Sequence, residues 1–79
     1  MMNFKQKELA QQLFDKLKAE FPDISLLGIA EQPDRSIWVK VATPIEDDLE
    51  IIEASGKETM DILLTYGYQI LVMPFENVK

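Results

Sequence analysis

The side chains with the most obvious chemical potential lie in one acidic run, Glu46-Asp47-Asp48-Leu49-Glu50-Ile51-Ile52-Glu53. On a helix, Glu46, Glu50 and Glu53 would fall within about 60° of one another, and carboxylates are ligands that suit Mg²⁺ and Ca²⁺. A simpler interpretation is that acids in a first helical turn complement the helix dipole, with Glu53 placed to pair with Lys57. Because no second cluster of ligands is evident in the sequence, we favour that interpretation and predict no metal or other cofactor.

Nucleophilic side chains are present, but the groups that would activate them are not. The chain contains no histidine, so Ser25, Ser36 and Ser55 cannot belong to a Ser-His-Asp arrangement. It also contains no cysteine, which excludes thiolate nucleophiles, thiolate metal sites and disulfides. Three aromatic side chains could stack on a ligand ring, although aromatics in a small domain usually serve packing: Trp38, Tyr66 and Tyr68. We therefore predict that the protein is not an enzyme.

The amino-acid composition indicates what kind of protein carries these residues. The 79 residues are 47% hydrophobic with only 3 Gly and 4 Pro, which is enough for one domain, residues 1–79, with a modest core. The net charge of −6 repels phosphate backbones and anionic lipid, so nucleic acid and membranes are poor partners. A core this small leaves little spare stability, and an oligomer would remedy that.

Three features of the sequence bear on where in the cell the protein is found. No apolar run approaches the roughly 20 residues that a membrane span requires. The first residues, MMNFKQKELAQQLF, lack the continuous apolar core of a signal peptide. Secreted chains of this size usually carry disulfides, so we expect a cytoplasmic protein.

The first half of the chain predicts a helix followed by a hairpin. Asn3 can cap the helix, with Gln6 three residues later in a capping box, and Pro22 ends it. The apolar residues recur at helical spacing: Ala10, Leu13, Phe14, Leu17 and Phe21. Residues 24–30 and 36–42 read as strands joined by a turn at 32–35.

The second half predicts a helix and a third strand. Thr43 and Glu46 form a capping box with Pro44 at the first helical position. One apolar stripe follows, which we expect to face the sheet: Ile45, Leu49, Ile52, Gly56, Met60, Leu63 and Gly67. Gly67 ends the helix and residues 68–75 form the strand. Close packing on the sheet would explain Gly56, with a kink at 54–56 as the alternative.

The order α-β-β-α-β predicts an α+β two-layer sandwich, with two helices on one face of a three-stranded sheet. The crossover from the second strand to the third should be right-handed. The pattern leaves open whether the third strand pairs with the first or the second.

Two helices cover one face of such a sheet, yet the first and third strands are apolar on both faces. Strict alternation places Ser25, Leu27 and Ile29 opposite Ile24, Leu26, Gly28 and Ala30. On the other two strands it leaves four large apolar side chains on the uncovered face: Trp38, Leu71, Met73 and Phe75. An apolar patch of this kind usually marks an interface, most often of a symmetric homodimer, although the chain could also cover it itself.

The order of four segments resembles the minimal nucleotidyltransferase domain: Leu9 to Phe21, Ser25 to Gly28, Ile37 to Val41 and Tyr66 to Ile70. Ile29 stands where that family's turn carries a serine. The family's Mg²⁺-binding carboxylates correspond to Ser36, Trp38 and Lys40 here. Because the metal-assisted mechanism needs those acids, the resemblance implies an inactive relative.

The same topology is similar to ribosome-binding factor A and related domains with the type II KH topology. Ala54-Ser55-Gly56 resembles the small-residue kink in their second helix, and that resemblance implies RNA binding. The residues around this position are acidic, where the family is usually basic: Glu50, Glu53, Glu58 and Asp61.

The sequence as a whole favours a non-enzymatic interaction or regulatory module that self-associates through its open sheet face as a homodimer, with another protein as the other possible partner. The alternative is a nucleotidyltransferase-like or type II KH-like domain that has lost or altered its nucleotide or RNA function.

Overall fold

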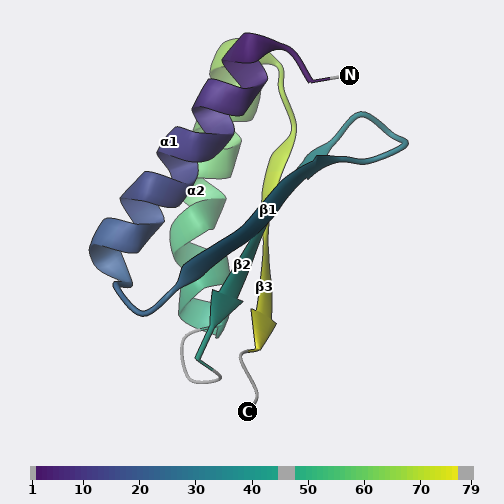
Figure 1. Cartoon of the computed structure of the whole chain (residues 1–79). Coiled ribbons are helices and arrows are strands. Elements are labelled where there is room, and N and C mark those ends of the chain that lie inside the picture. The colour runs from purple at the N-terminus through teal and green to yellow at the C-terminus, as the bar shows by residue number, and fades with distance from the viewer. Residues whose placement is uncertain (1, 45–47, 77–79) are drawn as a thin grey trace.

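The computed structural model describes residues 2–44 and 48–76 of the chain. Its elements are α1 (Phe4–Glu20), β1 (Ser25–Glu31), β2 (Ile37–Thr43), α2 (Asp48–Tyr66) and β3 (Ile70–Glu76). The predicted α-β-β-α-β order and α+β class are confirmed. Both helices lie on one side of the three-stranded sheet (Figure 1). No helix in the described ranges is long and apolar enough to span a bilayer.

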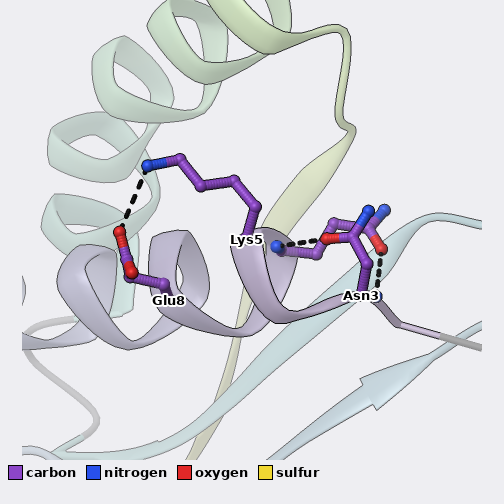
Figure 2. A network of polar contacts seen from close by, with 4 residues as sticks. Asn3, Lys5 and Glu8 are labelled. Atoms are coloured by element: carbon purple, nitrogen blue, oxygen red, sulfur yellow. Dashed lines mark hydrogen bonds and ion pairs between the residues drawn. The ribbon is translucent and has the colours of Figure 1, made fainter.

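The N-terminal end of α1 is capped as the sequence predicts (Figure 2). The Asn3 side chain accepts a hydrogen bond from the Gln6 N–H at 2.8 Å, and the Gln6 side chain accepts one from the Asn3 N–H at 2.9 Å. At the other end, the Lys18 ammonium donates to the carbonyls of Pro22 and Ile24 at 2.7 and 2.6 Å. The apolar stripe between these ends is buried: Leu9, Ala10, Leu13, Phe14 and Leu17.

The strands β1 and β2 form the predicted antiparallel hairpin. In its turn, the Asp34 carboxylate accepts hydrogen bonds from the hydroxyl and the N–H of Ser36, at 2.6 and 3.0 Å. These bonds stabilise the charged carboxylate and so lower the pKa of Asp34. Arg35, next to it, has a positive φ of 72°, and the Gln32 N–H closes the turn on the Ser36 carbonyl.

The prediction of strict alternation along β1 is wrong. A bulge shifts the register between Leu26, which pairs with Val41, and Gly28, which pairs with Lys40. Leu27 is the extra residue, so every side chain after it changes face. The residues of β1 that share a face with Trp38, Lys40 and Ala42 are therefore Ser25, Gly28 and Ala30.

The structure decides the sheet order, which the sequence left open. β3 pairs in parallel with β2, so β2 is central and the order is β1-β2-β3. The core lies between the sheet and the helices, where Ile37, Val39, Val41 and Ile70 are fully buried.

The start of α2 differs from the predicted one. Thr43 is the last residue of β2, fully buried, and its hydroxyl donates to the Pro44 carbonyl at 2.7 Å. Pro44 lies outside any helix, and the described part of α2 begins at Asp48. The cause is strand pairing, because the β2–β3 register continues as far as Thr43. Residues 45–47, and with them Ile45 and Glu46, lie outside the described residues.

The predicted buried face of α2 is also wrong. The residues that face the core are Ile51, Ser55 and Ile62, which recur at four and seven residues. The predicted stripe is largely exposed instead, with Leu49 at 70%, Ile52 at 48%, Met60 at 53% and Leu63 at 41%. Gly56 is exposed too, and a Cβ placed on it would meet nothing within 4 Å. The sheet therefore does not explain this glycine, and α2 carries two apolar stripes at helical spacing.

Candidate functional site

The face of the sheet turned away from the helices is the candidate site. In the β2–β3 register, Trp38 lies beside Leu71, Lys40 beside Met73 and Ala42 beside Phe75. Their neighbours along β2, Ile37, Val39, Val41 and Thr43, are buried under the helices. Because successive side chains of a strand point to opposite faces, the first set lies on the open face.

The structure brings all four predicted interface residues together on this face. Trp38, Leu71 and Met73 are partly buried, and Phe75 is 44% exposed. Adjacent strands in a sheet lie about 4.8 Å apart, so these side chains cover neighbouring positions of two strands. The result is a contiguous apolar surface over β2 and β3.

The open face is uneven, and the bulge in β1 is the reason. The β1 residues that pair with β2 on this face have small side chains: Ser25, Gly28 and Ala30. The large side chains therefore concentrate on β2 and β3, where they form a ridge along one side. Lys40 is the charged residue at the centre of this face, between Gly28 of β1 and Met73 of β3. Within the described ranges no hydrogen bond or ion pair holds its ammonium group.

No protein-family model, curated protein or solved structure shows significant similarity to this chain.

The acidic run does not assemble a metal site in the described residues. No group of three carboxylates or other ligating side chains there is placed to hold a metal ion. Glu50 and Glu53 are exposed, and Glu46 lies outside the described residues. The predicted pair of Glu53 with Lys57 does not appear among the ion pairs of residues 2–44 and 48–76.

The ion pairs among the described residues lie within α1 or join α1 to α2. Lys16 of α1 pairs with Glu58 of α2 at 2.9 Å, and Lys5 pairs with Glu8 one turn along α1 at 3.1 Å (Figure 2). Both pairs are solvent-exposed, so each contributes little to stability.

The aromatic residues divide between two places. Tyr66 and Tyr68 stack with ring centroids 6.3 Å apart, and the Lys5 ammonium lies 5.2 Å from the centre of the Tyr66 ring. The Asn3 side-chain amide donates a hydrogen bond to the Tyr68 hydroxyl at 3.3 Å, which connects the start of α1 to the segment after α2. Trp38 lies apart from them on the open face. The hydrogen bond and charge of Glu8 raise the pKa of Lys5, so this lysine remains a cation rather than a base.

Two of the three serines likewise have structural partners. The Ser36 hydroxyl donates to Asp34, and the Ser55 hydroxyl donates to the Ile52 carbonyl within α2 at 3.1 Å. The Asp34 carboxylate is a poor base for activating Ser36, because the hydrogen bonds that it accepts lower its pKa.

A recess of about 530 Å³ lies between the first turns of α1 and strand β1. Its lining is mainly apolar and includes Met2, Phe4 and Ile29, with Lys7 and Glu8 among its other residues. Because the wall it presents is mainly apolar, this recess offers a surface for contact and not a place for bond chemistry.

Proposed function

We propose that this protein is a non-enzymatic interaction module whose open sheet face binds a protein. The observation that supports this most is the shared face of Trp38, Leu71, Met73 and Phe75, opposite the helices. Contiguous apolar patches on the surface of small proteins often belong to interfaces. The absence of histidine and cysteine from the chain adds to the argument against catalysis.

The position of Lys40 favours a particular kind of partner. A symmetric copy on this face would bring two Lys40 ammonium groups together in apolar surroundings, and buried like charges oppose binding. A different protein with an apolar surface and one carboxylate opposite Lys40 would complete the face. We therefore place a partner of that chemistry here, with a second copy of the chain as the other occupant that the experiment distinguishes.

Changing Met73 to glutamate should remove this interaction with little effect on the fold. Met73 is partly exposed, so the free chain can solvate the new charge, but a bound partner would bury it. The new carboxylate would lie beside Lys40 and would occupy the ammonium group that we assign to the partner's carboxylate. Binding would then bury a surplus negative charge, which costs about 3–5 kcal/mol, a loss of affinity of more than a hundredfold. Circular dichroism checks that the variant is folded.

The measurement is quantitative co-purification from the native cytosol with tagged wild type, Met73→Glu, Lys40→Glu and Lys40→Arg. Leu64→Glu is the matched control, since Leu64 lies on α2, away from the sheet face, and is 77% exposed. A protein retained by wild type, Leu64→Glu and Lys40→Arg, but lost from Met73→Glu and Lys40→Glu, supports the proposal. Equal recovery with all variants contradicts it. Loss of self-association in Met73→Glu alone identifies the second copy as the occupant.

The alternative, a nucleotidyltransferase-like or KH-like domain, remains a hypothesis that no observed geometry favours. Gly28 lies inside β1 at the bulge and not in a turn, and α2 continues as a helix through residues 54–56. We expect millimolar ATP or GTP with Mg²⁺ to leave the melting temperature unchanged. Occupancy at a hundred times the Kd would add about 2.7 kcal/mol of stability. A rise of several degrees in a thermal-shift assay would therefore revive this alternative.

A further inference from the structure

The exposed apolar stripe of α2 is independent of the open sheet face. Its members are Leu49, Ile52, Gly56, Met60 and Leu63. At about 100° per residue, these five positions occupy a sector of about 80° around the helix. That is close to the width of the stripe that a helix normally buries against a core. No charged residue falls within the sector, although the chain as a whole carries a net charge of −6.

The contacts of α2 show where the stripe points. Ile51 and Ile62 face the sheet, and Glu58 faces α1 through its ion pair with Lys16. Glu58 lies about 160° around the helix from Gly56. The stripe therefore points away from α1, and α2 itself packs mainly on β3. This direction runs along the sheet and past its β3 edge.

The β3 edge lies on the same side of the molecule. In the described sheet β3 has β2 on one side and no strand on the other. The Ile37 N–H donates to the Gln69 carbonyl at 2.8 Å, which fixes which residues of β3 turn their backbone groups toward β2. By alternation, Ile70 and Val72 direct theirs outward. Pro74 also falls at an outward position, where its missing N–H costs no bond to β2.

The residues of the stripe are spaced symmetrically about Gly56, as a two-fold interface between two copies of this stripe requires. Its residues lie seven and four positions before Gly56 and four and seven positions after it. In an antiparallel pair of α2 helices about a two-fold axis at Gly56, Leu49 meets Leu63 of the second copy and Ile52 meets Met60 of the second copy. Such a two-fold interface uses the same surface on both protomers.

Gly56 fits the centre of that pair. Glycine in an exposed helix costs about 1 kcal/mol relative to alanine, and nothing within the described chain approaches it closely enough to require it. Two helices that cross at a glycine can bring their backbones together.

The size of this side is suitable for a dimer. The chain measures 34 × 22 × 18 Å, so the smaller side that contains its long axis fits a rectangle of 34 × 18 Å, or about 610 Å², before side-chain relief is counted. A stable interface buries about 800 Å² per partner, which is about 15% of the chain's 5268 Å² of accessible surface.

We propose that a second copy of this chain binds along the α2 stripe, antiparallel about a two-fold axis at Gly56, with the two β3 edges side by side. Because the stripe carries no charge, two acidic chains can approach each other there with the smallest electrostatic repulsion. The proposal does not depend on what occupies the open sheet face, which stays uncovered in this dimer.

Cysteine cross-linking tests this arrangement, because the native chain has no cysteine. Two cysteines can join when their Cα atoms lie about 4.4–6.8 Å apart. Gly56→Cys should therefore form a disulfide-linked dimer under mild oxidation at least tenfold faster than Lys57→Cys. Lys57 is the matched control because it is the next residue, is exposed, and points about 100° away from Gly56.

A second pair of variants measures association without any covalent bond. Ile52→Glu should raise the dimer dissociation constant in analytical ultracentrifugation by at least tenfold, whereas Leu64→Glu, at an apolar position outside the stripe, should not. Both wild-type side chains are exposed in the single chain, at 48% and 77%, so neither variant should unfold. Equal cross-linking rates of Gly56→Cys and Lys57→Cys, or a wild type that stays monomeric at millimolar concentration, overturns the proposal. Met73→Glu should leave the Gly56→Cys cross-linking rate unchanged. Failure of the sheet-face proposal can therefore be distinguished from failure of the dimer proposal.

Discussion

Replacing Ile51 with alanine should lower the free energy of unfolding by about 2–5 kcal/mol, the usual range for a fully buried isoleucine. Ile51 is 0% exposed and belongs to the core between α2 and the sheet. A domain of this size has only a few kcal/mol of stability to lose. The variant should therefore be partly unfolded at room temperature.

The matched control is its neighbour, Ile52→Ala. The Ile52 side chain is 48% exposed, so its truncation should cost about 1 kcal/mol or less by the area it removes from water. Urea unfolding followed by circular dichroism measures both values at dilute concentration, with an unchanged m-value as the check on two-state behaviour. The same variants test the rotation of α2. The sequence-based stripe predicts the reverse order, so a larger loss for Ile52→Ala would show that the helix is rotated by about 100°.

Two glycine-to-alanine changes in and after α2 should alter stability in opposite directions. Gly67 has a φ of 76° and its N–H donates to the Leu63 carbonyl at 2.9 Å, which closes the C-terminal end of α2. Because L-residues are strained in this left-handed conformation, Gly67→Ala should cost about 1–2 kcal/mol. Gly56 is helical and exposed, so Gly56→Ala should instead add up to about 1 kcal/mol.

Thermal unfolding at micromolar concentration measures both changes on the single chain. Each variant is the control for the other, since both add one methyl group to open space. If Gly56→Ala destabilised the dilute chain, a contact inside the protomer would be responsible for the glycine. At high concentration the gain at Gly56 should shrink, because a methyl group on the proposed two-fold axis separates the helices.

Local signals predicted the elements well where the cause was itself local. The box of Asn3 and Gln6 needs only the first turn of α1, and it forms as expected. The left-handed Gly67 ends α2 for an equally local reason. The open face of β2 and β3 also followed from alternation, because neither strand contains a bulge.

Predictions failed where a competing long-range contact decided the outcome. Thr43 can cap a helix, but the strand register with β3 holds it in β2. The extra residue at Leu27 follows from how β1 meets β2, and no residue of β1 signals it alone. Helical spacing predicts that the exposed stripe of α2 is its core face. A count of apolar positions at helical spacing could have shown two stripes, but not which one faces the sheet.

The sequence by itself determined the order α-β-β-α-β, the uncovered apolar side chains of β2 and β3, and the lack of histidine and cysteine chemistry. Periodicity, capping and composition carry that information residue by residue. Only the tertiary structure decided the strand order, the faces of β1 after its bulge and the rotation of α2. Each of these depends on which of several similar apolar surfaces meet. Surfaces of equal hydrophobicity gain similar free energy when they are buried, so shape and register select among them.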